Sequence, residues 1–155
     1  VRGPNLFSGY WPDGADGPDE QGWFGTGDVA VRDEDGALYL VGRTSELVIV
    51  NGFNVYPAEV EAVLAAQPGV AEVAVVGVPD ARTGEAVHAY VVAAPGARRD
   101  PDALLAGAAG SLARFKLPAR IEYVSVLPRT VTGKVMKWRL TASSGSAQGG
   151  RPGGA

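Results

Sequence analysis

The segment GRTSELVIVNGFNVYPAEVE, from Gly42 to Glu61, constrains the fold of this chain more than any other stretch. Gly42 and Arg43 close a strand, Glu46 to Val50 is a short apolar run, and Gly52 permits a backbone turn. Pro57 suits the first position of a helix, because its missing N–H is not needed there. We therefore predict the order strand, pivot, strand, turn and helix, with the pivot joining two differently composed halves of the chain.

Upstream of this segment, the sequence predicts a loop followed by a β-hairpin. Residues 11–22 are rich in glycine, proline and acidic residues, which is typical of a surface loop. Apolar and polar residues alternate on both sides of the dipeptide Asp35-Gly36. This pattern predicts two strands, Val29–Arg32 and Ala37–Val41, connected by a tight turn.

Downstream, helical and strand patterns alternate. After the helix that starts at Pro57, two nearly continuous apolar runs, 70–78 and 85–93, are typical of buried central strands. Asp100 suits the N-cap of another helix, a further strand is predicted over 119–127, and the loop PRTVTGK then leads into a short helix that begins in VMKWRL. The predicted fold class is α+β, a small mixed sheet with packed helices, preceded by the β-hairpin.

Composition argues against several classes of function. The longest apolar runs are far shorter than the roughly 20 residues of a transmembrane helix, so no transmembrane segment is predicted. The net charge is −3 and no basic run appears, which argues against a nucleic-acid partner. The chain has no cysteine, which excludes disulfides, thiolate metal sites and cysteine nucleophiles and fits a cytoplasmic protein.

Three motifs carry a resemblance to a known family: WFGTGD before the hairpin, the segment from Gly42, and LPRTVTGK near the C-terminus. Together they resemble the adenylate-forming (AMP-dependent) acyl-CoA synthetases, a superfamily shared with luciferases and peptide-synthetase adenylation domains, over nearly all of residues 1–140. The resemblance implies that residues 1–43 end a large core domain and that residues 44–140 form a small mobile C-terminal domain. The Gly- and Ser-rich residues 141–155 are expected to be a disordered tail. The chain is thus expected to be a C-terminal fragment that lacks its large N-terminal core domain.

The resemblance also implies roles for individual residues. Lys134 matches the family's catalytic lysine, whose compact charge can neutralise oxygens of the α-phosphate and the carboxylate. Asp28 matches the carboxylate that accepts hydrogen bonds from both ribose hydroxyls of ATP, and Arg43 matches the arginine that reaches the ribose or the phosphates. Ser45 takes the hinge position, where the family usually has Asp or Lys. Gly52 matches the glycine along which the pantetheine arm of CoA passes.

Each of these residues also has a simpler interpretation. Lys134 would be an exposed lysine in a turn, Asp28 a turn or cap residue, and Arg43 one half of a surface ion pair. Gly52 would serve only the geometry of its turn. Lys116, in the motif FKLP, is better interpreted as an exposed lysine than as a contact to a CoA phosphate.

The implied activity is that of an AMP-forming acid–thiol ligase, which first makes an acyl adenylate and then an acyl-CoA. Its partners would be a small-molecule carboxylate, expected to be a fatty acid or a related acid, with ATP, CoA and Mg²⁺. The magnesium site would lie in the missing large domain, and the fragment alone is expected to be inactive. Two alternatives stay open, namely the adenylation domain of a peptide synthetase and a stand-alone nucleotide- or CoA-binding module.

Overall fold

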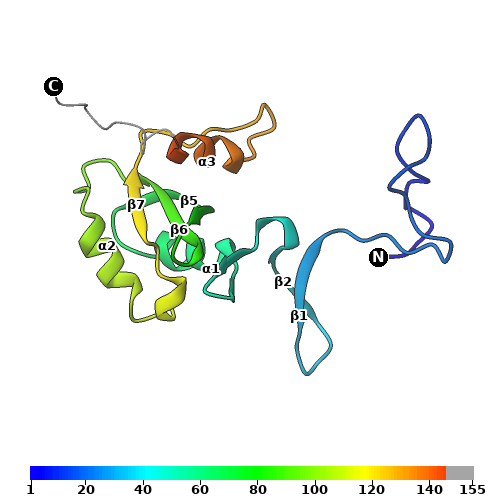
Figure 1. The fold of residues 1–155 in the computed structure, drawn as a ribbon, viewed down its shortest axis with the longest axis horizontal. Coiled ribbons are helices and arrows are strands. Elements are labelled where there is room, and N and C mark those ends of the chain that lie inside the picture. The colour runs from blue at the N-terminus through cyan, green and yellow to red at the C-terminus, as the bar shows by residue number, and fades with distance from the viewer. Residues whose placement is uncertain (146–155) are drawn as a thin grey trace. The chain divides into compact units, whose positions relative to one another are not determined.

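The computed structural model describes residues 1–145. The chain divides into two compact units, Val1–Ser45 and a second unit that begins at Glu46 (Figure 1). The division falls inside the segment predicted to contain the pivot.

The predicted order of elements around the pivot is confirmed, with one short strand added. The elements are, in order, β2 (Leu38–Arg43), the 3-10 helix η1 (Thr44–Glu46), β3 (Val48–Val50), β4 (Phe53–Val55) and α1 (Pro57–Ala65). The strand β4 was not predicted. It pairs antiparallel with β3 around Asn51 and Gly52, whose φ angles of 51° and 81° form a two-residue hairpin turn.

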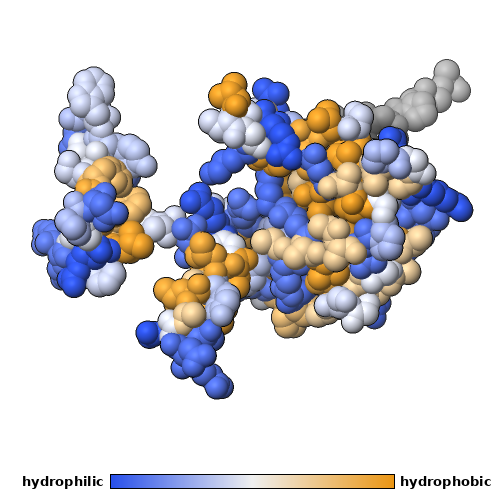
Figure 2. Space-filling model, turned by 180° about the vertical axis from the view of Figure 1, so that it is seen from behind, coloured by the Kyte–Doolittle hydropathy of each residue, from blue (hydrophilic) through white to orange (hydrophobic). Residues whose placement is uncertain are grey.

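The first unit contains the predicted hairpin but no core of its own. Strand β1 (Asp28–Arg32) pairs antiparallel with β2, as the alternation on both sides of Asp35-Gly36 predicts. None of the residues in this unit is buried. Leu38, Tyr39 and Leu40 are each more than half exposed, and Figure 2 shows apolar surface on the hairpin. The hairpin is thus a sheet without a covering layer.

The second unit is a mixed five-stranded sheet with helices on both faces. The remaining elements are β5 (Val70–Asp80), β6 (Gly84–Ala93), α2 (Pro101–Ala108), η2 (Arg114–Lys116), β7 (Arg120–Tyr123) and α3 (Lys137–Gly145). The sheet order is β4-β3-β6-β5, and β7 adds to β6 in parallel. The α+β prediction is confirmed. Of the two strands predicted to be central, only β6 has partners on both sides, whereas β5 lies at an edge.

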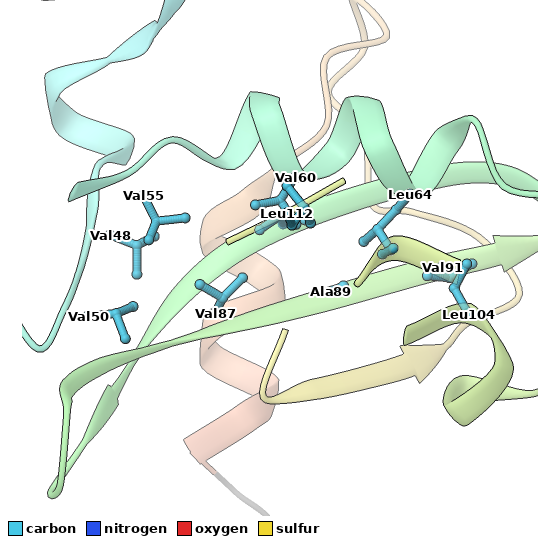
Figure 3. Close-up of a cluster of buried hydrophobic side chains, with 12 residues drawn as sticks. Val48, Val50, Val55, Val60, Leu64, Val87, Ala89, Val91, Leu104 and Leu112 are labelled. Carbon is cyan, nitrogen blue, oxygen red and sulfur yellow. The ribbon is translucent and has the colours of Figure 1, made fainter. Parts of the chain in front are cut away.

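The two apolar strands are buried because helices cover both faces of the sheet. On one face, Val60 and Leu64 of α1 and Leu104 of α2 point toward Val87 and other side chains of β6 (Figure 3). On the other face, a second cluster joins residues of β5 and β6 to the C-terminal part of the chain. Its members are Ala74, Val76, Val78, Ala86, Tyr90, Leu127 and Leu140. Covered faces, rather than a central position, explain the continuous apolar pattern of β5.

The helix α3 corrects the expected start of the tail. The chain stays helical to Gly145 instead of losing structure from Thr141. Leu140 is only 5% exposed, and its carbonyl accepts a hydrogen bond from the Tyr90 hydroxyl at 3.0 Å. This packing holds the helix against the sheet at Leu140. The helix then continues through small residues that composition alone assigns to the tail. The rest of the expected tail, residues 146–155, lies outside the described residues.

Candidate functional site

The three lysines of the chain have different surroundings, and only one is available to a ligand. Lys116 Nζ lies 2.6 and 2.7 Å from the two carboxylate oxygens of Glu59. Lys137 Nζ lies between two further carboxylates. In the described part of the chain, Lys134 is exposed and its ammonium group makes no ion pair. The prediction that Lys116 is simply exposed is wrong, because it is about three-quarters covered and ion-paired.

Lys134 projects from a loop that closes on itself. The Thr130 N–H donates to the Lys134 carbonyl at 2.8 Å, and the Gly133 N–H donates to the Thr130 carbonyl at 2.9 Å. The Lys134 N–H in turn donates to Thr130 Oγ1 at 3.1 Å. Gly133 has a φ of 85°, which a side chain would disfavour. The lysine therefore sits on an ordered turn rather than on a loose loop.

Arg129 ties this loop to the sheet. Its Nη1 donates to the Gly133 carbonyl at 2.6 Å, and its Nη2 pairs with Glu72 Oε2 of β5 at 2.6 Å. Sequence reasoning missed this residue, although Arg129 stands inside the motif LPRTVTGK. The spacing of four residues between Arg129 and Gly133 is visible in the sequence, whereas Glu72 lies 57 positions from Arg129.

Asp28 and Arg43 face each other at the open end of the hairpin in the first unit. They are cross-strand partners, and Arg43 Nε donates to Asp28 Oδ1 at 2.9 Å. The hydrogen bond from Arg43, followed by one with Thr26, lowers the pKa of Asp28 below its usual value of 3.8. The carboxylate is thus charged at neutral pH. An ionised carboxylate offers about four acceptor sites, so the bond to Arg43 leaves capacity for a ligand.

Ser45 is the last residue of the first unit and lies exposed within η1. The next residue, Glu46, belongs to the second unit and is fastened to it. Lys137 Nζ of α3 lies 2.7 Å from Glu46 Oε2 and 2.9 Å from Glu61 Oε1. Burial by itself lowers the pKa of Lys137, but its hydrogen bond to Glu46 and the charge of Glu61 outweigh burial and raise it above 10.5. The chain is therefore anchored directly after Ser45.

Gly52 lies at the tip of the β3–β4 turn, beside an open groove. A side chain at this position would meet no atom within 4 Å, so the glycine is needed for its positive φ and not for space inside this chain. The groove has a volume of about 580 Å³ and is lined by Asn51, the two arginines Arg82 and Arg114, and Phe115, among others. Sequence reasoning missed both arginines, because neither stands in a motif.

The described residues do not provide a metal site. No group of three or more His, Cys, Asp or Glu side chains among residues 1–145 could hold a metal ion, so these residues do not fit a magnesium site. In the same part of the chain, no helix has the length and apolar character of a membrane span.

The fold and these groups define a small α+β domain that presents Lys134, a lysine with no ion pair in the described residues, on a braced turn. Residues 59–134 match the family of the AMP-binding enzyme C-terminal domain. The chain thus contains the C-terminal AMP-binding domain of an adenylate-forming acyl-CoA ligase family member.

Several named ligases are similar to this chain. A 3-[(3aS,4S,7aS)-7a-methyl-1,5-dioxo-octahydro-1H-inden-4-yl]propanoyl:CoA ligase of Mycobacterium tuberculosis is 47% identical over 90% of this chain. A feruloyl-CoA synthase of Amycolatopsis is 46% identical over 88%. A fatty acid–[acyl-carrier-protein] ligase, ScoC, of Streptomyces coeruleorubidus is 47% identical over 88%. The chain spans only 27% to 28% of the length of these relatives.

Solved structures of similar proteins contain nucleotides. ATP-bound MatB from Rhodopseudomonas palustris is 44% identical, with a TM-score of 0.84 over 92% of this chain and 29% of its own. The o-succinylbenzoate CoA synthetase MenE from Bacillus subtilis, in complex with the acyl-adenylate intermediate OSB-AMP, is 34% identical. Its TM-score is 0.83 over 100% of this chain and 31% of its own.

We expect a ¹³C NMR titration of the Asp28 carboxyl group to give a pKa below 3.8. A lowered pKa means that the interaction with Arg43 is fully present above the ordinary value and is lost as pH falls through the lowered one. Arg43→Gln should move the midpoint upward, because the guanidinium charge is gone. Arg32→Gln, at the other end of the hairpin, is the matched control and should leave it in place. A midpoint at or above 3.8 would contradict the role given to the pair.

Proposed function

We propose that this chain is the C-terminal portion of an ATP-dependent carboxylate–CoA ligase that forms an acyl adenylate and then an acyl-CoA. The observation that carries the proposal is Lys134, the one lysine without an ion-pair partner in the described residues, on an ordered turn of a domain from this family. A reaction between two anions requires a nearby positive charge that no carboxylate of the protein already neutralises.

In the first half-reaction, a carboxylate oxygen attacks the α-phosphorus of ATP and pyrophosphate leaves. Both reactants are negatively charged, and charge regroups around the α-phosphate as the new bond forms. Lys134 would neutralise oxygens of the α-phosphate and the attacking carboxylate. Its ammonium group is compact and can serve both through its three donors.

Asp28 and Arg43 would bind the nucleotide in this half-reaction. The charged Asp28 carboxylate can accept hydrogen bonds from both ribose hydroxyls, because Arg43 occupies only part of its acceptor capacity. Arg43 is 54% exposed, so its remaining N–H donors can reach the ribose or a phosphate. The same ion pair that orders the hairpin would thus orient the ligand.

The second half-reaction transfers the acyl group from AMP to the thiol of CoA. The groove beside Gly52 is suited to a long anionic ligand, since two arginines, Arg82 and Arg114, line it against one carboxylate, Asp80. Phe115 adds an aromatic edge. The open space over Gly52 would let the pantetheine arm pass close to the backbone. Gly52 would therefore serve both the turn and the ligand.

A pivot at Ser45 would let the second unit serve both half-reactions in turn, presenting Lys134 for the first and the Gly52 side for the second. Its support is the division of the chain at this residue and the anchoring of Glu46 by Lys137 directly after it. A rotation would then be confined to the few bonds around Ser45.

Residues 1–43 would belong to a large core domain. Their support is the absence of any buried residue in the first unit and the exposed apolar side chains of β2. That domain would hold the acid and most of the ATP. We propose a fatty acid or a related carboxylic acid as the substrate. The main alternative acceptor is the thiol of a carrier protein, because one relative is named as an acyl-carrier-protein ligase.

We expect Lys134→Ala in the complete ligase to slow adenylation by about 10²- to 10³-fold, the effect of losing one preorganised stabilising group. Thioester formation from supplied acyl adenylate should stay near normal. Acid-dependent pyrophosphate exchange measures the first step, and acyl-CoA release the second. Val131→Ala, an exposed change in the same loop, is the control. Equal losses in both steps would contradict the role of the lysine.

We expect Gly52→Asn to slow thioester formation by about 10- to 100-fold, the range that a small misplacement of a reactant costs. Asparagine tolerates the positive φ, so the turn should survive while its side chain enters the path of the ligand. Gly96→Asn is the matched control, since Gly96 has a φ of 76° and the same open space. Normal acyl-CoA formation with CoA, together with normal adenylation, would exclude Gly52 from the CoA site.

We expect Ser45→Pro to change the balance of the two half-reactions. Proline fixes its own φ and restricts the residue before it, so one orientation of the second unit should be favoured by about tenfold or more in relative rate. Ser45→Ala keeps backbone freedom and should behave normally. If the proline variant keeps both rates, the pivot lies elsewhere.

A further inference from the structure

The turn that presents Lys134 has a single polar connection to the sheet among the described residues. Residues 128–136 bond mainly to one another, for example from the Met136 N–H to the Pro128 carbonyl at 2.7 Å. The connection outward is made by Arg129, which holds the Gly133 carbonyl and the Glu72 carboxylate at 2.6 Å each. Internal bonds keep the shape of the turn, and within residues 1–145 Arg129 alone fixes it against β5 by a directional contact.

Glu72 is placed for this contact by the alternation of β5. The register of β5 against β6 shifts between Val70 and Glu72, and from Glu72 onward the strand alternates regularly. Glu72 alternates in phase with Ala74 and Val76, which belong to the cluster under α3. Its carboxylate thus lies on the face of the sheet where the turn crosses.

We propose that Arg129 is a positioning residue for adenylation, which holds the Gly133–Lys134 turn at a fixed place on the second unit through Glu72. The proposal rests on the proposed function of Lys134. A lysine reaches its target through a flexible four-carbon stem, so the place of its backbone sets where the ammonium group can act. The planar fork of an arginine can bond a carbonyl and a carboxylate at once, which a single ammonium group cannot reproduce in the same geometry.

The positioning role of Arg129 differs from a role in the stability of the whole domain. The side chains of Arg129 and Glu72 are 42% and 44% exposed, and ion pairs of this kind contribute little to stability. The turn is instead held to the core by Leu127, which is 2% exposed. Loss of Arg129 should therefore loosen the turn while the domain stays folded.

The first test measures the turn itself, by NMR hydrogen exchange on the 155-residue chain. We expect Arg129→Ala to speed exchange of the Gly133 and Lys134 amides by about tenfold or more, with protection of β6 unchanged. Arg98→Ala is the matched control, because it removes another surface arginine whose ion pair, to Asp100, is elsewhere. Unchanged exchange at Gly133 and Lys134 would overturn the inference, whatever the kinetics.

The second test measures both half-reactions in the complete ligase. We expect Arg129→Ala to lower kcat of adenylation about tenfold at little cost in KM for ATP, and to spare thioester formation from supplied acyl adenylate. Arg129→Lys keeps the charge without the fork and should stay impaired. In a Lys134→Ala background, Arg129→Ala should cause no further loss, because its effect acts through that lysine.

The outcomes separate the two proposals. Normal adenylation by Arg129→Ala, beside a strong loss in Lys134→Ala, would overturn the positioning role and leave the proposed function intact. Normal adenylation by Lys134→Ala would overturn the proposed function itself, and with it the purpose of the contact. Additive losses in the double variant, or equal losses in both half-reactions, would show an effect on the fold and overturn the positioning role.

Discussion

The pairing of β5 with β6 is the interaction on which the rest of the second unit depends. It runs from Val70 against Ala93 to Asp80 against Gly84, and it supplies side chains to an apolar cluster on each face of the sheet. The helices α1 and α2 pack on one cluster, and α3 on the other. The turn that holds Lys134 lies between two segments anchored in the second cluster, by Leu127 before it and Leu140 after it. The place of the candidate catalytic group is thus a product of core packing.

Much of the fold could be predicted because its signals are local. The hairpin turn at Asp35-Gly36 and the N-cap of α2, where Asp100 Oδ1 accepts a hydrogen bond from the Ala103 N–H at 3.0 Å, depend on residues close in sequence. The errors arose where distant packing decides. An apolar run shows that both faces of β5 are covered, but it does not show that one edge has no partner strand among the described residues. The composition after Leu140 does not show that the helix continues.

In the candidate site, too, some features have a local sequence signal and others depend on residues that are distant in sequence. The motif LPRTVTGK singles out Lys134 by resemblance, but its distinction from Lys116 and Lys137 depends on carboxylates far away in sequence. Counting register back from the hairpin turn places Asp28 opposite Gly42, and only the register shift between Val29 and Ala30 brings Arg43 to that position. The contact between Arg129 and Glu72 was not predictable either, because it depends on the path of the chain across the sheet.

The edge position of β5 has a further consequence, which concerns association between copies. An unpaired strand edge offers N–H and C=O groups to a strand of another molecule, which is a route to aggregation. Here the Glu61 side chain accepts the hydrogen bond of the Val75 N–H at 2.8 Å in the middle of that edge. The same carboxylate is held by Lys137, so a charged pair occupies the place where a foreign strand would have to add. The second unit therefore disfavours the addition of a strand from another molecule at this edge of β5.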